Sequence, residues 1–349
     1  MAKQRTGERP RVTLNHLAAR LKVSVTTVSN AFNRPDQLST ELRERVLAEA
    51  QLLGYDGPDA MARGLRTGKT HIIGVVLTED LAYSFDDPIA NRFLCGVAQV
   101  LDRHGHRLLL VPERSLHGTA SEPMADGFVV YGVENDSSLV ERLRQRGKPV
   151  VTVDFELPDT PSVRIEDRRA MGELSRWALA NTPAHFEPVI VSLRLERWRS
   201  QGEDGKPKLE LMQHVRLDSI CSALQEAGHD PEKVAIFDVE HNTQRHAEAV
   251  LEAALQDRRP RLLLCMTDRI ALGALTVAER LGLSVPGDIR IIGFDGLDEG
   301  QRRSPQLTTV YQDSQRKGEL AACMVLGLDR APRRTLAGWS IYGETCPPA

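Results

Sequence analysis

The sequence has no long hydrophobic run and no cysteine pair at a redox or metal-binding spacing. Its longest apolar stretches, such as Ile72–Leu77 and Leu262–Met266, have the length of a β-strand, whereas a membrane-spanning helix needs about 20 apolar residues. The N-terminal segment MAKQRTGERPRVT contains no apolar signal core, so we expect no secretory leader. Five cysteines without a CxxC spacing favour reduced thiols in a cytoplasmic protein, and they are Cys95, Cys221, Cys265, Cys323 and Cys346.

Motifs of common enzyme classes are also absent. No GxGxxG follows the first predicted strand, and the chain contains neither a Walker loop with its lysine nor a GxSxG nucleophile turn. The ten histidines are scattered and show no metal-ligand spacing. We therefore expect no catalytic residue, no metal ion and no cofactor.

The charge of the chain is unevenly distributed. Residues 1–70 contain twelve Lys and Arg and seven Asp and Glu, a net charge of +5, which leaves −8 for the remainder of a chain with −3 in total. A basic segment on an acidic body suits binding of a phosphate backbone by that segment alone. By itself the asymmetry does not distinguish a DNA-binding segment from a solvated basic arm. The length of 349 residues suits two to three domains.

Three short amphipathic helices are predicted near the start of the chain. Thr13 is a suitable N-cap for a helix over Leu14–Leu21, and Ser24 is one for a second helix over Val25–Phe32. A third helix starts near Ser39 and ends at Gly54. A generic three-helix bundle would explain these apolar stripes.

A bundle alone does not explain the composition of the second helix. Its exposed face carries no charge and only short side chains, which can enter a major groove and contact base edges or a thymine methyl group. These side chains are Val25, Thr26, Thr27, Ser29 and Asn30. Lys22 occupies the preceding turn, where Gly is usual, and a left-handed conformation there costs about 1–2 kcal/mol. We therefore interpret the first segment as a DNA-reading helix-turn-helix headpiece.

A hinge helix is predicted over residues 58–69. Its core, PDAMARGLR, is too short to form a stable isolated helix, and Gly64 weakens it by about 1 kcal/mol. A flexible linker would contain more Gly, Ser and Pro. We therefore expect a helix that folds only on DNA.

From Ile72 onward, apolar strands alternate with amphipathic helices. Continuous apolar strands form parallel sheets that helices cover on both faces. The pattern runs twice, so the fold class is an all-α headpiece followed by an α/β body of two doubly wound parallel-sheet lobes. The predicted strands are 72–77, 107–111, 127–131 and 149–153 in one lobe and 188–193, 234–237, 262–266 and 290–293 in the other.

Polar side chains stand at the ends of several predicted strands, where such sheets bind ligands. The candidates for a small-molecule site are Asp154, Arg216, Thr267 and Asp295. Each alone also has an ordinary role, as a helix cap or in a surface ion pair. Tyr83 and Phe85, after the first strand, suit an apolar face for a ligand and equally suit core packing.

Three segments of the chain carry a family resemblance. They read VTLNHLAARLKVSVTTVSNAFNRP, LSTELRERVLAEAQLLGY and GPDAMARGLRTGKT. In order and spacing they are similar to the headpiece of the LacI/GalR family of bacterial transcription regulators, and the resemblance continues through nearly the whole chain. It implies a homodimer whose headpieces read a near-palindromic operator in double-stranded DNA, and a body like a periplasmic binding protein.

The resemblance also implies roles for individual residues. It makes Val25 and Thr26 the main base readers, and it places Leu65 as an apolar wedge in the minor groove. Ala62 would also contact DNA, and Arg63 and Arg66 would add phosphate or minor-groove contacts. The side chains that it places mainly on phosphates are Thr13, Ser24, Thr27, Ser29 and Asn33. Asn30 stands where the family commonly has Arg, so the half-site sequence does not carry over.

For the body, the resemblance implies a small, sugar-like effector held between the lobes. Arg216 and Asp295 would grip its hydroxyl groups, and Asp154 and Thr267 would complete a polar wall. Thr267 replaces the more usual Asn or Ser. Most relatives are repressors released by a sugar, so a repressor is the default expectation, although the same residues also allow a corepressor.

The expected domains are the headpiece, the hinge and two lobes. Their boundaries are 1–57 for the headpiece, 58–69 for the hinge, 70–163 with 311–328 for the N-terminal lobe, and 164–310 with 329–349 for the C-terminal lobe. The tail 335–346 is expected to add an edge strand to the C-terminal lobe. We expect the protein in the cytoplasm, on the nucleoid when bound to its operator. The alternative is a solute receptor of the periplasmic-binding-protein type, against which the headpiece argues.

Overall fold

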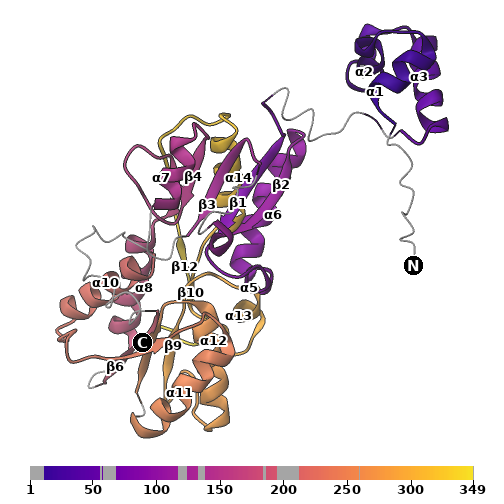
Figure 1. The fold of residues 1–349 in the computed structure, drawn as a ribbon. Helices are drawn as coiled ribbons and strands as arrows, with labels where there is room; N and C mark the ends of the chain where they lie inside the picture. The colour runs from indigo at the N-terminus through magenta and orange to yellow at the C-terminus, as the bar shows by residue number, and fades with distance from the viewer. Residues whose placement is uncertain are drawn as a thin grey trace, which may run out of the picture. The chain divides into compact units, whose positions relative to one another are not determined.

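The computed structural model describes residues 12–55, 57, 68–116, 124–132, 138–183, 186–194, 212–258 and 260–348. The chain divides into two compact units, Met1–Thr70 and His71–Ala349 (Figure 1). The core of the predicted hinge, with Ala62, Leu65 and Arg66, lies outside the described residues. Among the residues that are described, no helix has the length and apolar character needed to cross a membrane.

The first unit is a bundle of three short helices. Its buried core consists of Leu17, Ala18, Val28, Ala31, Val46 and Ala50. The side chains of Thr13, Ser24 and Ser39 cap the three helices by accepting backbone N–H groups of the first turns, at the positions that the sequence predicts. The elements are α1 (Leu14–Leu21), α2 (Val25–Asn33), η1 (Pro35–Gln37) and α3 (Thr40–Leu52).

The turn between α1 and α2 is tight. Lys22 lies in the left-handed region, at φ 54° and ψ 42°, and the N–H of Val23 donates to the oxygen of Ala18 at 3.0 Å. A non-glycine residue in this conformation costs about 1–2 kcal/mol. The close packing of Ala18 and Val28 on either side of the turn offsets that cost and fixes the direction of α2.

The second unit contains two parallel sheets, and we call each sheet with its covering helices a lobe. The first lobe has strand order β11-β5-β4-β3-β1-β2, and every pairing in it is parallel. This arrangement agrees with the continuous apolar runs of the sequence. The strands are β1 (Ile72–Leu77), β2 (Arg107–Pro112), β3 (Gly127–Tyr131), β4 (Val150–Val153), β5 (Ser162–Ile165) and β11 (Arg333–Leu336).

Helices cover both faces of the first sheet. Ile73, Val75 and Leu77 of β1 pack against α6 and α14, whereas Val76 packs in the cluster that contains α7. This division follows from the two-residue period of side chains along a strand. The helices of this lobe are α5 (Leu81–Asp86), α6 (Pro88–Arg103), η2 (Glu113–Leu116), α7 (Ser138–Gln145) and α14 (Ser314–Val325).

The second lobe repeats this plan around a sheet of strand order β7-β6-β8-β9. Helices α8 and α10 contribute to one core cluster, and α11 and α12 contribute to the other. The strands are β6 (Pro188–Leu193), β7 (Ala235–Val239), β8 (Leu262–Cys265) and β9 (Arg290–Ile292). The helices are α8 (Asp167–Asn181), α10 (Met212–Glu226), α11 (Gln244–Arg258), α12 (Asp268–Arg280) and α13 (Asp298–Arg302).

The chain crosses between the lobes three times, from β5 to α8, from β10 (Thr309–Tyr311) to α14, and from β11 to β12 (Trp339–Ile341). The last crossing corrects one prediction. Thr335 and Leu336, expected in an edge strand of the C-terminal lobe, belong to β11, which pairs with β5 of the first sheet. The sequence RRTL is polar and its strand is mostly exposed, so no apolar pattern ties it to either sheet. β12 instead pairs antiparallel with β10.

Candidate functional site

Helix α2 presents an exposed surface at its first turn. Val25 is 43% exposed and Thr26 is also exposed, whereas Val28 and Ala31 are fully buried against the rest of the bundle. An apolar side chain held outward at the start of a capped helix suits contact with base edges and thymine methyl groups in a major groove. The structure therefore leaves both predicted base readers accessible.

The hydroxyl groups at the two helix starts are held by capping bonds. Ser24 Oγ accepts the backbone N–H of Thr27 at 2.9 Å and lies 2.8 Å from Thr27 Oγ1. Thr13 Oγ1 accepts the backbone N–H of His16 at 3.4 Å. These predicted phosphate contacts are thus fixed at helix N-termini, where the helix dipole also favours an anion.

The polar groups farther along α2 are also engaged locally. Asn33 Nδ2 donates to the backbone oxygen of Ser29 at 2.9 Å. Asn30 Nδ2 donates to Gln37 Oε1 of η1 at 3.1 Å. This bond uses the Asn30 amide that was predicted to contact a base. Asn30 would therefore have to exchange the bond to Gln37 for a bond to DNA.

In the second unit, Arg216 on α10 is the centre of a buried polar network. It is 1% exposed, which is rare for arginine unless it is paired. Its Nε donates to Asp167 at 2.8 Å, its Nη1 donates to the backbone oxygen of Met266 at 2.8 Å, and Nη1 lies 3.6 Å from Asp295 Oδ1. The guanidinium lies over the ring of Phe294, 3.6 Å from its centroid. The structure thus brings together the predicted pair Arg216 and Asp295.

Asp295 follows β9 in an uncommon backbone conformation, with φ at 132°. It is 3% exposed and accepts a hydrogen bond from Gln312 Nε2 at 2.6 Å. Burial raises the pKa of Asp295 to about 8, against the lowering effect of Arg216. Burial likewise raises the pKa of the neighbouring Asp268 to about 6. Strained backbone and shifted carboxyl pKa values both concentrate at functional sites.

The network continues into the first lobe through Lys317 of α14. This lysine is 1% exposed and donates to both oxygens of Asp154, at 2.7 and 2.9 Å, and to Gln312 Oε1 at 3.3 Å. Asp154, at the end of β4, has a positive φ of 66°. Because Gln312 also donates to Asp295, one chain of polar contacts runs from Asp154 to Arg216 across the lobe junction.

Thr267 and Tyr83 meet at Asn242, and Phe85 lies elsewhere. Thr267 caps α12 and its Oγ1 donates to Asn242 Oδ1 at 2.6 Å. Tyr83 Oη donates to the backbone oxygen of Asn242 at 3.2 Å, and burial raises the pKa of Tyr83 well above its usual range. Phe85 is 59% exposed on α5. The core-packing interpretation of Phe85 is therefore wrong.

Sequence reasoning missed Asp167, Asp268, Gln312 and Lys317. Lys317 lies in an amphipathic helix, where a lysine is normally solvated, and its partner Asp154 is 163 residues away in the chain. Gln312 could have been found, because it directly follows the buried strand β10, as Asp154 follows β4.

The chemistry of this network suits a hydroxyl-bearing ligand. The carboxylates accept hydrogen bonds, Arg216 and Lys317 donate them, and a hydroxyl group does both. In the part of the chain that the structure describes, no group of three or more His, Cys, Asp and Glu side chains is placed to hold a metal ion.

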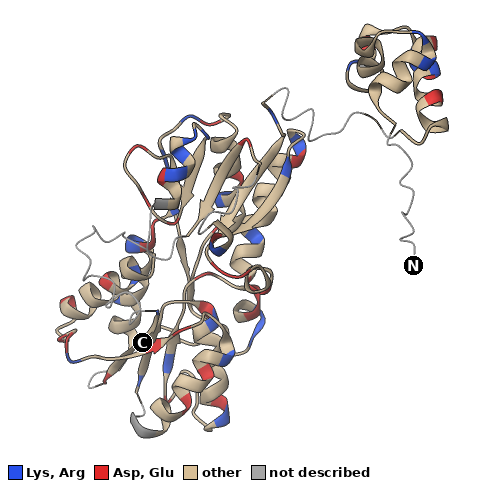
Figure 2. Ribbon diagram, viewed as in Figure 1, with Lys and Arg blue, Asp and Glu red and all other residues tan. Residues whose placement is uncertain are grey.

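Ion pairs connect the two lobes at their surface. Arg92 of α6 pairs with Asp298 of α13 at 2.6 Å, and Arg269 of α12 pairs with Asp86 of α5 at 2.5 Å. Ile89, in the first turn of α6, packs in a core cluster of the second lobe. Figure 2 shows charges of both signs over both lobes. Exposed pairs each contribute about 0.2–1 kcal/mol, so these contacts bias the lobe arrangement weakly.

Comparison with known proteins shows extended similarity to transcriptional regulators. The chain is 43% identical over 332 residues to an HTH-type transcriptional regulator of Mycobacterium tuberculosis, covering 91% of each chain. It is 37% identical over 322 residues to the HTH-type transcriptional regulator IpsA of Corynebacterium glutamicum, covering 88% of each. A family model described as a periplasmic binding protein-like domain matches residues 205–338. The role of these relatives is not enzymatic.

Solved structures show the same fold. A LacI family transcriptional regulator from Corynebacterium glutamicum is 29% identical, with a TM-score of 0.66 over 95% of this chain and 98% of that one. The lac repressor dimer bound to operator and an anti-inducer is 19% identical, with a TM-score of 0.73 over 96% and 99%. A complex of the regulator CelR with cellobiose is 22% identical, with a TM-score of 0.65 over 96% and 100%. The chain belongs to the LacI family of helix-turn-helix transcriptional regulators.

Proposed function

We propose that this regulator is a repressor that binds a near-palindromic operator as a homodimer and responds to a small polyhydroxy effector, such as a sugar, held between its lobes. The observation that carries the DNA part is the exposed first turn of α2, with Val25 and Thr26 outward. The capped hydroxyls of Thr13, Ser24 and Thr27 flank that turn and suit phosphate contacts.

The effector part is supported by the buried network at the lobe junction. Arg216, Asp295, Gln312, Lys317 and Asp154 form continuous contacts from one lobe to the other. A ligand that takes over some of these contacts changes the energy of the lobe arrangement directly. The cellobiose complex of a fold neighbour supports a sugar as the ligand class, and the lac repressor dimer on its operator supports a dimer on DNA.

The proposed coupling runs from the lobe junction to the hinge. Effector binding changes the angle between the lobes, and that change aligns or separates the two hinge segments, residues 58–69. We assign Leu65 of the hinge to the minor groove and Ala62 and Arg66 to further DNA contacts. Couplings of this kind amount to about 1–3 kcal/mol. Helices α6, α12 and α14 are the proposed dimer face, and the protein acts in the cytoplasm, at the nucleoid when bound.

Selection from random duplex DNA tests this function. Full-length protein at a stated salt concentration should enrich a near-palindrome with a flexible pyrimidine–purine step at its centre, because two α2 helices and a central wedge impose that symmetry. Binding that is salt-sensitive but has no sequence preference would contradict the proposal and leave only a basic arm.

A further inference from the structure

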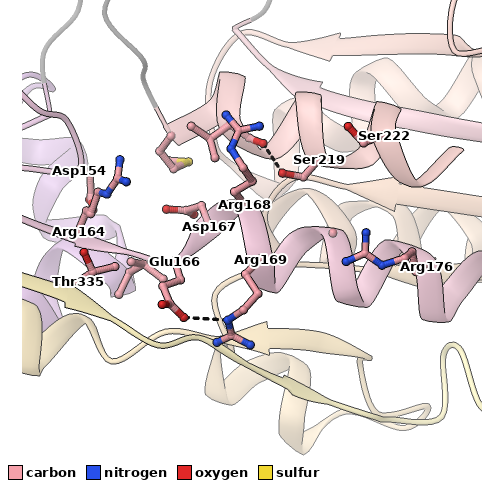
Figure 3. Close-up of a pocket in the computed structure, with 14 residues that line it drawn as sticks. Asp154, Arg164, Glu166, Asp167, Arg168, Arg169, Arg176, Ser219, Ser222 and Thr335 are labelled. Carbon is pink, nitrogen blue, oxygen red and sulfur yellow. Dashed lines mark hydrogen bonds and ion pairs between the residues drawn. The ribbon is translucent and has the colours of Figure 1, made fainter. Parts of the chain in front are cut away.

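A cavity of about 670 Å³ at the β5–α8 crossing belongs to the site already described (Figure 3). Its lining residue Asp154 is held by Lys317 of the lobe-junction network at 2.7 Å. A separate group of side chains with binding chemistry lies at the opposite edge of the first sheet. Because the strands of this sheet are parallel, Asp154 follows the carboxyl end of β4, whereas His71 and His106 precede the amino ends of β1 and β2.

Strand pairing makes His71 and His106 neighbours. Ile72 pairs with Arg107 in the parallel ladder of β1 and β2, so the residues just before them lie side by side at the start of the two strands (Figure 1). Adjacent strands lie about 4.8 Å apart. The two imidazole rings are 5.3 Å apart between their centroids, with their planes at 52°. The register of the sheet therefore brings together two rings that are far apart in the sequence.

The turn before β2 fixes which nitrogen of the His106 ring carries the proton. His106 Nδ1 lies 2.9 Å from the backbone oxygen of His104. A carbonyl oxygen only accepts hydrogen bonds, so Nδ1 is the donor and the neutral ring presents Nε2 with a lone pair. Histidines that bind metal ions are commonly oriented in this way, by a bond from the other ring nitrogen to a backbone oxygen. His106 is thus oriented to provide a nitrogen ligand.

The backbone of His71 is anchored, while its ring can turn. Its N–H donates to Asp126 Oδ2 at 2.9 Å, and its carbonyl oxygen accepts the N–H of Arg107 at 2.8 Å. Within the residues that the structure describes, its exposed ring contacts the His106 ring and forms no hydrogen bond. Rotation about the bond to an imidazole ring is soft. A nitrogen of the His71 ring can therefore turn towards an ion that His106 Nε2 holds.

We propose that His71 and His106 together bind one divalent late transition-metal ion, of the class of Zn²⁺ and Ni²⁺. Imidazole nitrogens suit these metals. With each nitrogen about 2.0–2.1 Å from the ion, two rings at a tetrahedral angle have centroids about 5 Å apart, close to the 5.3 Å between these rings. In the described part of the chain, no third His, Cys, Asp or Glu completes a group with them. Water would occupy the remaining positions, as in an open site.

An ion at this place would fix the point where the chain enters the second unit. His71 is the first residue of that unit, and it closely follows the predicted hinge, residues 58–69. The ion would join it to the turn between α6 and β2. Binding of the ion does not depend on the proposed repressor function. Only the consequence for the hinge rests on that function.

Calorimetric titration of the untagged full-length protein with Ni²⁺ tests this site. The parent protein for all samples carries His241→Ala/His246→Ala, because those two rings also lie close together, at 4.7 Å between centroids. We expect the parent to bind one Ni²⁺ per chain. It should show no saturable binding of Mg²⁺, which prefers oxygen ligands.

Variants of the two turns identify the ligands. His106→Gln should weaken Ni²⁺ binding about tenfold or more, because even the loss of an outer-shell partner typically costs that much. The matched control is His104→Ala. It removes an imidazole from the same turn but keeps the backbone oxygen that holds His106 Nδ1, so it should bind Ni²⁺ as the parent does.

His71→Gly guards against misfolding. Glycine adopts the φ of 55° found at this position without strain and keeps both backbone hydrogen bonds, so this variant should fold as the parent does and lose Ni²⁺ binding. Thermal unfolding without metal checks the fold. Unchanged affinity in His71→Gly or His106→Gln, equal loss in His104→Ala, or no saturable Ni²⁺ binding by the parent would each overturn the inference. None of these outcomes bears on operator selection, so the two proposals fail separately.

Discussion

The headpiece surface and the lobe-junction network present polar groups in opposite ways. Val25 and Thr26 of α2 are exposed and fixed in direction by a capped helix on a small core. Arg216 and Lys317 are about as buried as leucines of the core, and each pairs with a carboxylate of the protein, Asp167 and Asp154 respectively. The α2 surface is exposed and available to a partner, whereas the polar groups of the lobe-junction network bond to one another inside the protein.

This difference implies two kinds of recognition. The helix α2 is rigid before DNA arrives, so binding needs little reorganisation of its side chains. The junction network must exchange internal hydrogen bonds for bonds to a ligand, and this exchange couples occupancy to the lobe arrangement. Mutations should therefore affect the two surfaces differently. Changes at the junction should strongly lower the free energy of unfolding, and changes at α2 should lower it little.

The largest effect is expected for Arg216→Leu. This change leaves Asp167 buried without the cation that lies 2.8 Å from it, and breaking one side of a buried pair costs about 3–5 kcal/mol. Urea unfolding of the full-length protein measures the loss of unfolding free energy. Val25→Ala is the matched change at the open surface and should lose less than about 0.5 kcal/mol. Similar losses in the two variants would refute the comparison.

A smaller effect, dependent on pH, is expected for Asp295→Asn. The folded-state pKa of about 8 lies above the ordinary 3.8, so the stability that this group contributes is complete below pH 4 and is lost as pH rises through 8. Asn keeps the neutral shape, so the variant should be more stable than the wild type at pH 8 by up to a few kcal/mol and equal to it near pH 4.

Two features sharpen this pH test. Asp268, with a pKa of about 6, should leave a residual slope between pH 4 and 6 in the variant. Asp329→Asn is the control, because Arg334 lowers the pKa of Asp329, and it should leave the slope between pH 5 and 8 unchanged. If the unfolding free energy of the wild type did not change from pH 5 to 8, Asp295 would not have the raised pKa of about 8.

Ser24→Ala probes the rigidity of the open surface. Loss of the bond from the Thr27 N–H should cost the headpiece about 1 kcal/mol of unfolding free energy, while the second unit keeps its stability. Hydrogen exchange of α2 amides in the full-length protein reports this local loss. Unchanged exchange would mean that the cap does not hold α2 in place.

The smallest effect is expected at the lobe surface. Removing the Arg92–Asp298 pair by Asp298→Asn should cost no more than about 1 kcal/mol, because the carboxylate is largely exposed. Swapping the two charges in the double variant Arg92→Asp/Asp298→Arg should restore most of the lost unfolding free energy at low salt. A double-mutant cycle with no coupling would show that the pair does not contribute to lobe closure.

The sequence predicted the regular elements well because their signals are local. The caps at Thr13 and Ser24 and the apolar strands, such as Ile72–Leu77, depend on neighbouring residues alone. β11 was assigned to the wrong sheet because four polar residues on an edge carry no pattern that selects a partner.

The site was predictable only in part for a related reason. Asp154 and Asp295 follow buried strands, and that position drew attention to them. Lys317 has no comparable sequence signal, since it lies within a helix and its burial results from contacts with Asp154, which is distant in the sequence, and with Gln312.

Base reading by α2, with no contact between the junction and DNA, is what separates the two surfaces most clearly. The most direct measurement is to repeat the DNA selection with Val25→Ala and with the control Gln51→Ala, an exposed residue of α3. We expect Val25→Ala to relax the base preference at one symmetric position of each half-site, by about 1 kcal/mol or more, and Gln51→Ala to keep the wild-type preference. A uniform loss of affinity with an unchanged preference for Val25→Ala would contradict base reading by α2.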